Sequence, residues 1–441
     1  MTLSQARKSI IYASNTADFK AAVAQLIAEA DASIIAEIFI DLQSRLTVWV
    51  LDKNVAEADK NAAIDACEAF LKNADAAALR EAKKEVASIA TASSTYLCKQ
   101  HDAGRMGFIW GHDLATGFYW SLRRGARFVT TNPAKVEVFH KDCPEKWNEL
   151  LAELRADYPN LTPEETVTNM YVRVVAMVME ELQPIYEASE GKYGFACIQP
   201  NPTTLMDAES MEADIRYFES EFRRIFKTDD PNVVYKIPAT PAARKTVKAL
   251  RQDPCYRLCM TLDFSVFQHD TFGDIIGEGD HGDFLVLMGG IVDDFAKKEL
   301  IAQGMDEAEA TEISHYAATA ILNRSYANNK AKGIKPIIMA GSARGAWSTE
   351  AVVCEDADQP MCITSMANMI AVYDSAPRAN VDVVGQPLDE EKLAILRKSK
   401  IFCQAFEFDG LSDETLMDYP PLKFVQASFE KAYYETLESL K

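Results

Sequence analysis

A single lysine interrupts an apolar, β-branched run. The stretch VVYKIPAT, residues 233–240, carries Lys236 between Tyr235 and Ile237. Such a run favours a β-strand, and Pro238 favours an edge strand or the end of a strand. One interpretation is a lysine that protects a sheet edge from aggregation. The other is a lysine at the end of a buried strand, where loss of hydration favours the neutral amine that can attack a carbonyl carbon.

Other polar side chains follow apolar runs in a similar way. The set consists of Asp113, Thr131, Asn132, Gln199, Thr261, Ser342 and Arg344. A lysine with an acid, amides and hydroxyls is what aldol chemistry through a Schiff base requires. The amine condenses with a ketone, the iminium accepts electrons, and an acid–base group moves the hydroxyl proton. These side chains can act together only if the fold brings the ends of the runs to one place.

Eight short apolar runs follow residue 105, and segments with helical periodicity separate most of them. The runs are MGFIWG (106–111), ARFVTT (126–131), YGFACIQ (193–199), VVYKI (233–237), YRLCMTLDF (256–264), DFLVLMG (283–289), KPIIMAG (335–341) and NVDVVG (380–385). Strands that alternate with helices predict a parallel sheet, and eight of them over roughly 280 residues predict a (β/α)8 TIM barrel. A doubly wound open sheet is the alternative. A closed barrel has no edge to protect, and its chemistry lies at the carboxyl ends of the strands, which favours the catalytic interpretation of Lys236.

Helical regions flank the predicted barrel on both sides. Residues 1–104 are rich in Ala, Leu, Glu and Lys with helical spacing, so we expect a helical N-terminal extension followed by a barrel domain over residues 105–441. The stretch PLKFVQASFEKAYYETLESLK predicts a final amphipathic helix. We expect the extension to cover the barrel mouth or to build an interface, and the sequence leaves a homo-oligomer open.

The charge of the chain narrows the classes of partner. The 441 residues carry a net charge of −20, which disfavours nucleic acid or an anionic membrane as the main partner because both require basic surface. A small anionic substrate needs only a local basic site. No run reaches the roughly 18 apolar residues of a membrane span, and the N-terminus does not resemble a signal peptide. Nine cysteines without CxxC spacing predict reduced thiols in a cytoplasmic protein.

Four motifs together make the chain resemble the transaldolase family. They are Thr130-Thr131-Asn132-Pro133, Lys236-Ile237-Pro238-Ala239-Thr240, Thr261-Leu262-Asp263-Phe264-Ser265 followed by Gln268, and Gly341-Ser342-Ala343-Arg344. They occur in the order of the family and at about its spacing. The resemblance covers roughly residues 105 to 390 and does not cover the first hundred residues.

The resemblance implies a cofactor-free and metal-free enzyme that moves a dihydroxyacetone unit from a ketose, or ketose phosphate, to an aldose acceptor. Lys236 would form the Schiff base and Asp113 would be the acid–base group. Gln199 and Thr261 would position water, and Asn132, beside Thr131, would bind substrate hydroxyls. Ser342 and Arg344 would hold the phosphate.

Three positions depart from the pattern of the family. Gln199 replaces a glutamate, and an amide can orient a water but cannot act as a base. Cys259 stands at a substrate-binding position where the family has an asparagine, which removes an amide near the bound dihydroxyacetone unit. Gly290 stands where the family has an arginine that binds phosphate. The loss of one charged contact would cost about 1.5–3 kcal/mol of binding.

Alternative interpretations follow from these departures and from two other features. Gln199 also fits a simple aldolase of the fructose-6-phosphate aldolase type, which releases free dihydroxyacetone, and the departures fit a barrel that binds or assembles without catalysis. The stretch GEGDHG, residues 277–282, matches a dinucleotide fingerprint but precedes an apolar run, so we interpret it as a solvated loop, with a metal site as the weaker alternative. We interpret His112 as structural, because neighbours on a strand point to opposite faces.

Overall fold

The computed structural model describes most of the chain after residue 108. The described residues are 109–116, 118, 121, 126–253, 255–277, 282–352, 361–366, 369 and 383–440, with five isolated positions before residue 100. Apart from those positions, the predicted N-terminal extension over residues 1–104 lies outside the described residues.

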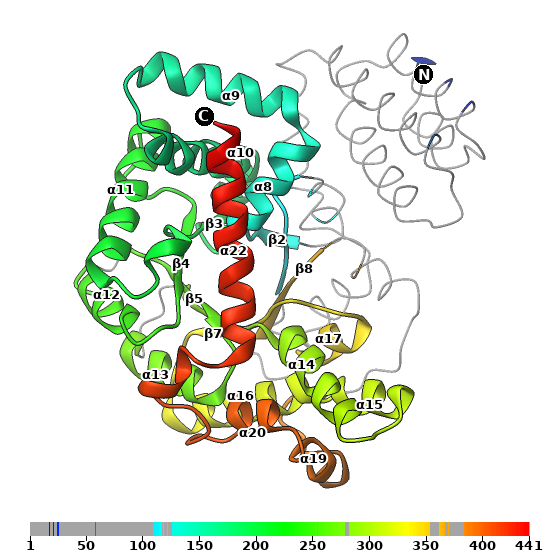
Figure 1. Ribbon diagram of the computed structural model, residues 1–441. Coiled ribbons are helices and arrows are strands. Elements are labelled where there is room, and N and C mark those ends of the chain that lie inside the picture. The colour runs from blue at the N-terminus through cyan, green and yellow to red at the C-terminus, as the bar shows by residue number, and fades with distance from the viewer. Residues whose placement is uncertain are drawn as a thin grey trace.

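Eight parallel strands form a closed barrel. They are β1 (Ile109–His112), β2 (Ala126–Val129), β3 (Phe195–Ile198), β4 (Val233–Pro238), β5 (Leu258–Asp263), β6 (Phe284–Leu287), β7 (Ile337–Ala340) and β8 (Met361–Ser365). The strands, several of which are labelled in Figure 1, pair in chain order. Strand β8 pairs with β1, which closes the barrel. The predicted (β/α)8 barrel is therefore confirmed, and the open doubly wound sheet is wrong because the two outer strands pair with each other.

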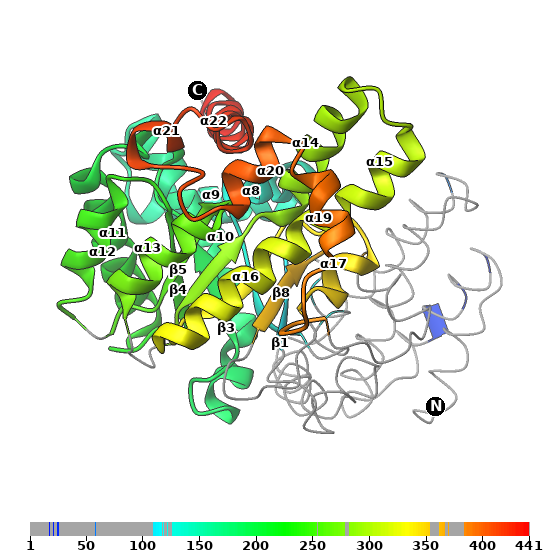
Figure 2. The same ribbon diagram turned by 90° about the horizontal axis from the view of Figure 1, so that it is seen from below.

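Helices alternate with the strands and surround the barrel (Figure 2). Those that precede residue 280 are α8 (Pro133–Asp142), α9 (Pro144–Asp157), α10 (Pro163–Ala188), η1 (Pro202–Thr204), α11 (Ala208–Phe226), α12 (Ala243–Leu250) and α13 (Val266–Ile276). Those that follow are α14 (Gly289–Ala302), α15 (Glu307–Ser314), α16 (Ala317–Lys332), α17 (Ala346–Glu350), α19 (Glu390–Leu396), α20 (Lys400–Phe406), α21 (Asp413–Leu416) and α22 (Pro420–Ser439). None of these described helices combines the length and the apolar character that a membrane span requires.

Alternate residues of each strand face the inside and the outside of the barrel. On β4, Val234 lies in the inner cluster, whereas Tyr235 and Ile237 pack against the surrounding helices. The inner cluster consists of Phe128, Phe195, Cys197, Val234, Cys259, Phe284, Val286, Met339 and Cys362. Gly111 makes room for one of these rings, because a Cβ atom there would lie 2.1 Å from the ring of Phe128. Lys236 has the same parity as Val234, so its side chain points into the barrel.

Two helix starts follow directly from the sequence. Thr162 and Glu165 form a capping box at the start of α10, in which each side chain accepts a hydrogen bond from the backbone of the other. At the start of α8, Asn132 is the N-cap and Pro133 the first helical residue. Asn132 is thereby fixed at the carboxyl end of β2.

The eighth strand is not where the apolar run NVDVVG predicts it. Residues 383–385 of that run form a turn, and residues 380–382 lie outside the described residues. The strand is β8, with the sequence MCITS. A strand of a parallel barrel is covered on both faces and therefore reads as a continuous uncharged run, whereas the alternation in NVDVVG is typical of a strand with one face in water.

The predicted C-terminal helix is α22, and it crosses one end of the barrel (Figure 1). It contacts α8, α10, α14 and β5. Figure 2 shows it nearly end-on, outside the layer of strands. The last twenty or so residues of the chain thus cover the end of the barrel at which the polar side chains gather.

Candidate active site

One cavity at the carboxyl ends of the strands joins most of the predicted site residues. Its volume is about 250 Å³. Six of the predicted residues line it: Asp113, Asn132, Lys236, Thr261, Ser342 and Arg344. The remaining polar lining comes from Lys135, Thr364, Ser365 and Ser428, and the apolar lining includes Met288, Ile291, Met366, Phe424, Val425 and Phe429. Four of the lining residues come from α22, so the C-terminal helix forms one wall of the cavity.

Lys236 lies at the inner end of this cavity. Its side chain is only 5% exposed, and its Nζ atom donates a hydrogen bond to the carbonyl oxygen of Thr131 at 3.2 Å. In the register of the sheet, Lys236 is opposite Cys259, and Pro238 is opposite Thr261. The amine therefore reaches the cavity from a strand that neighbours hold on both sides.

Asp113 directly follows β1 and is held by a chain of hydroxyl groups. The Thr130 hydroxyl donates to Oδ1 of Asp113 at 2.8 Å. Because that proton is used, the Thr130 oxygen accepts a hydrogen bond from the hydroxyl of Thr364 on β8. The backbone N–H of Asp113 donates to the carbonyl oxygen of Ser365 at 3.0 Å. Strands β1, β2 and β8 thus fix this carboxylate together.

The carboxylate of Asp113 also has a cation beside it. Nζ of Lys135 lies 3.4 Å from Oδ2 of Asp113. Burial by itself would raise the pKa of Asp113, but Lys135, Lys236 and the Thr130 hydroxyl together hold it below its ordinary value. Asp113 is therefore ionised in the neutral pH range, as a group that accepts a proton must be.

Asn132 and Thr261 present an amide and a hydroxyl to the same cavity. The side-chain oxygen of Asn132 accepts a hydrogen bond from the backbone N–H of Lys135 at 3.0 Å, so its amide nitrogen is the group that can donate to a substrate hydroxyl. Thr261 is followed by a break in the pairing of β5 with β6 and by Leu262, whose φ of 50° lies in the left-handed region. The Gln268 side-chain nitrogen donates to the carbonyl oxygens of Leu262 at 2.8 Å and Ala239 at 2.9 Å, which holds this strained turn in place.

Ser342 and Arg344 follow β7 in a tight turn. Ser342 has a φ of 58°, a second strained residue at the cavity. The Arg344 guanidinium donates from Nε to Asp294 at 3.0 Å and from Nη1 to the carbonyl oxygen of Ser342 at 3.0 Å. Part of its capacity to bind an anion is therefore already occupied by a carboxylate.

Gly290 is required by the close approach of the same turn. A Cβ atom at this position would lie 1.9 Å from the carbonyl oxygen of Ser342 and 2.9 Å from Cγ of Arg344. The backbone after β7 and the side chain of Arg344 thus occupy the space that an arginine at position 290 would need. The packing of this turn therefore requires a glycine at position 290.

We expect Gly290→Ala to destabilise the protein by about 1–3 kcal/mol, the usual cost of forcing atoms into a packed site. The free energy of unfolding in denaturant measures this cost. Gly273→Ala in α13 is the matched control, because its new methyl group would meet only the side chain of Ile334, at 3.0 Å. The control should change stability by no more than about 1 kcal/mol. Equal effects of the two substitutions would contradict the assigned role of Gly290.

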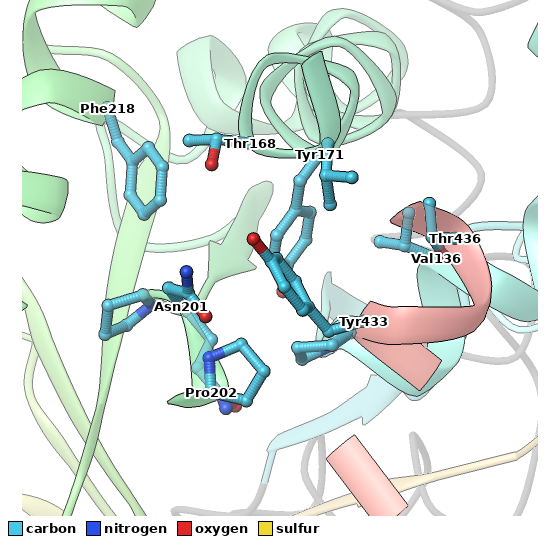
Figure 3. A pocket seen from close by; sticks show the side chains of 12 residues that line it. Val136, Thr168, Tyr171, Asn201, Pro202, Phe218, Tyr433 and Thr436 are labelled. Atoms are coloured by element: carbon cyan, nitrogen blue, oxygen red, sulfur yellow. The ribbon is translucent and has the colours of Figure 1, made fainter. Parts of the chain in front are cut away.

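Two predicted residues lie outside this cavity, next to a second pocket. Gln199 lines a pocket of about 30 Å³ with residues of α8, α10, α11 and α22. Figure 3 shows Tyr433 of α22 and Tyr171 of α10 beside this pocket. Within the part of the chain that the structure describes, the side-chain amide of Gln199 has no hydrogen-bond partner. Thr131 is fully buried, and its hydroxyl donates to the carbonyl oxygen of Cys197 at 2.6 Å and therefore accepts from Tyr171.

Cys259 also lies away from the cavity lining. It is fully buried in the inner cluster of the barrel with Cys197 and Cys362. Thr261, two residues later on the same strand, has the same parity and lies closer to the carboxyl end, where it reaches the cavity. Cys259 therefore forms part of the packing beneath the site.

His112 has a structural environment. A carbonyl oxygen can only accept, so Nε2 donates to the carbonyl oxygen of Thr116 at 2.9 Å and Nδ1 accepts from the hydroxyl of Ser121 at 2.8 Å. Burial lowers the pKa of His112 to about 4. The ring is therefore neutral at physiological pH, and its hydrogen bonds go to Thr116 and Ser121 rather than to Asp113.

The loop 277–282 is mostly outside the described residues, which exclude 278–281. Of its acidic neighbours, Asp283 pairs with Arg251 at 2.6 Å and Asp270 pairs with Lys332. Among the described residues, no group of three His, Cys, Asp or Glu side chains is arranged to hold a metal ion.

Three residues around Asp113 are not singled out by their types and spacing. Thr130 belongs to a quoted motif, but its inward direction follows only from its parity with Phe128. Thr364 lies on β8, the strand that the pattern of apolar runs does not predict. Lys135 occupies the first turn of a helix, where an acidic residue is favoured, and that unusual placement was the available signal.

Comparison with known proteins finds one stretch of similarity. No family model matches this chain. A stretch of 114 residues is 32% identical to Transaldolase 1 of Streptomyces avermitilis. The match is to a transaldolase. It covers 26% of this chain and 28% of that protein, so the chain spans less than a third of the length of this curated relative. The similarity and the barrel fold are compatible with an activity of the aldolase or transaldolase type.

Proposed function

We propose that this chain is a transaldolase-like enzyme that transfers a dihydroxyacetone unit from a ketose or ketose phosphate to an aldose or aldose phosphate through a Schiff base on Lys236. The observation that carries the proposal is the cavity that contains the Lys236 amine and the ionised Asp113 carboxylate together, with Asn132 and Thr261 beside them. The polar ends of different strands converge there, as in barrel enzymes generally.

The reaction follows from these groups. The Lys236 nitrogen adds to the ketone carbon, and water leaves to give an iminium. Asp113 takes the proton from the hydroxyl next to the breaking carbon–carbon bond, and the electron pair of that bond moves into the iminium to form an enamine as the aldehyde leaves. The enamine then attacks the acceptor aldehyde, Asp113 returns the proton, and water releases Lys236.

The charge of the cavity supports an anionic substrate. The lining has three cationic side chains, Lys135, Lys236 and Arg344, and one carboxylate, Asp113. This local excess of positive charge contrasts with the net charge of −20 for the whole chain. We propose that Ser342 and Arg344, which follow the carboxyl end of β7, hold a phosphate or another acidic group of the substrate.

Two substitutions should move the affinity for a phosphorylated donor in opposite directions. Arg344→Met should raise KM for fructose 6-phosphate about 10-fold or more, because a charged hydrogen bond is lost. Asp294→Asn should lower it by up to about 5-fold, because Arg344 loses an exposed competing carboxylate. Dihydroxyacetone, which has no phosphate, serves as the control donor, and equal effects on both donors would contradict the assignment.

Borohydride trapping tests the proposal directly. The protein is incubated with fructose 6-phosphate, sedoheptulose 7-phosphate or dihydroxyacetone, reduced, and mapped by mass spectrometry. An adduct on Lys236 is expected, and its absence with all three ketoses in folded protein would favour a barrel that binds without catalysis. Product analysis with and without an acceptor aldehyde then separates transfer from the simple release of dihydroxyacetone.

A further inference from the structure

Lys135 is a cation in a place where its helix does not favour one. It is the third residue of α8, after Pro133 and Ala134, and the first turn of this helix contains no acidic residue. The N-terminus of a helix carries partial positive charge, which disfavours a lysine there. The helix itself therefore gives no reason for this residue.

The contacts of Lys135 lie on the cavity side. Its side chain lines the cavity and is 19% exposed, and its Nζ atom is 3.4 Å from Oδ2 of Asp113, whose side chain is 20% exposed. The other carboxylate oxygen, Oδ1, accepts from Thr130. Each oxygen of Asp113 thus has its own partner, one a neutral hydroxyl from β2 and the other a cation from α8.

We propose that Lys135 is a positioning residue that keeps Asp113 ionised in the resting enzyme and thereby sets the lower pH limit of carbon–carbon bond cleavage. This inference rests on the proposed function. Lys236 becomes bonded to the substrate in the proposed reaction, so Lys135 is the lysine that remains beside the carboxylate.

The charged and titratable groups that face Asp113 come from several elements of the barrel. Lys135 comes from α8, Lys236 from β4 and neutral His112 from β1, and more weakly coupled groups come from Tyr171 on α10 and Cys197 on β3. Lys135 and Lys236 lower the pKa of Asp113 against the effect of burial. Removal of Lys135 should therefore raise the pKa of Asp113, so that a smaller fraction of it is ionised in mildly acidic solution.

The first experiment compares pH profiles of kcat/KM for cleavage of fructose 6-phosphate, the direction in which Asp113 must accept a proton. Lys135→Met should lose about 10-fold at pH 5 and much less at pH 8, which moves the acid limb to higher pH. Lys135→Arg should keep the wild-type limb. Lys146→Met is the matched control, because Lys146 is the third residue of α9, also follows a proline at the first position, and lies outside the cavity lining. An acid limb of Lys135→Met that coincides with the wild type would overturn the inference.

Trapping of dihydroxyacetone separates this inference from the proposed function. Lys135→Met should still form the adduct on Lys236. If the wild type forms no adduct, the Schiff-base function is wrong. If the wild type and Lys135→Met both form it and share one acid limb, the function stands and the role of Lys135 is wrong.

A second measurement needs no substrate. A depressed pKa for Asp113 means that its ion pair stabilises the protein above the unfolded pKa and that this contribution is lost as pH falls through the folded pKa. The difference in Tm between wild type and Lys135→Met should therefore shrink as the pH falls from 7 to about 3, below the ordinary pKa of an aspartate. In an Asp113→Asn background the same difference should not depend on pH. A pH-independent difference in both backgrounds would contradict the ion pair.

Discussion

Replacement of Lys236 with methionine is expected to abolish the borohydride-trapped adduct and to reduce the transfer of a dihydroxyacetone unit by about 10⁴-fold or more, the scale of effect seen when a covalent nucleophile is lost. Methionine preserves most of the length of the side chain and suits the buried position, which is only 5% exposed. The chemistry is lost because no other residue of the cavity lining supplies a primary amine at that depth.

Two comparisons make this result specific. The Tm of Lys236→Met should stay close to that of the wild type, since a buried amine that donates to one carbonyl is exchanged for an apolar group of similar length. Lys135→Met, which removes the other lysine of the cavity, should keep the adduct on Lys236. An adduct that persists in Lys236→Met, or that maps to Lys135, would reject the assignment of the nucleophile.

Asp113→Asn should separate Schiff-base formation from cleavage of the carbon–carbon bond. An amide cannot accept the hydroxyl proton, so the rate of cleavage of fructose 6-phosphate should fall by about 10²–10⁴-fold. Dihydroxyacetone forms its iminium without any such bond breaking, so it should still be trapped on Lys236. Single-turnover release of the aldehyde and the yield of the reduced adduct measure the two steps independently.

The control for Asp113 is an acid outside the cavity. Asp270→Asn in α13 removes a carboxylate that pairs with Lys332 on the outer surface, and it should leave both steps unchanged. Equal loss of trapping and cleavage in Asp113→Asn would mean that Asp113 serves the attack of the amine rather than the bond cleavage.

The barrel could be predicted because buried parallel strands leave a clear pattern. Seven of the eight apolar runs contain a strand, from MGFIWG to KPIIMAG, because continuous uncharged runs between helical segments are what a doubly covered strand requires. The prediction of the eighth strand was wrong, because β8 has the sequence MCITS rather than NVDVVG. Methionine and cysteine carry little strand preference, whereas NVDVVG offered three valines and the period of a half-exposed strand.

The part of the site that belongs to the sequence motifs could be predicted. Residues at the carboxyl ends of strands converge in any parallel barrel, which is why Asp113, Asn132, Lys236 and Thr261 meet in one cavity. Gln199 does not line that cavity, although it follows β3 with the parity of Phe195. Spacing gives the face of a strand to which a side chain belongs, but not the direction that its flexible end takes after the strand stops.

The electrostatic partners could not be read from the motifs. Lys135 approaches Asp113 from a helix that begins about twenty residues later in the chain, and Asp294 approaches Arg344 from α14. Such pairs depend on how helices pack against the barrel rather than on the local sequence. The clash that explains Gly290 is of the same kind, because it involves the backbone of a turn that follows another strand.

The position of α22 has a consequence for when the protein becomes active during its synthesis. Trp110 of β1 pairs with Ile363 of β8, so the barrel cannot close until most of the chain has been made. The cavity then still lacks the wall that Phe424, Val425 and Phe429 supply. Because α22 is made after every strand of the barrel, a nascent chain with a closed barrel would still hold Lys236 in an unfinished site. A ketone therefore meets a complete cavity only after α22 has packed against the barrel.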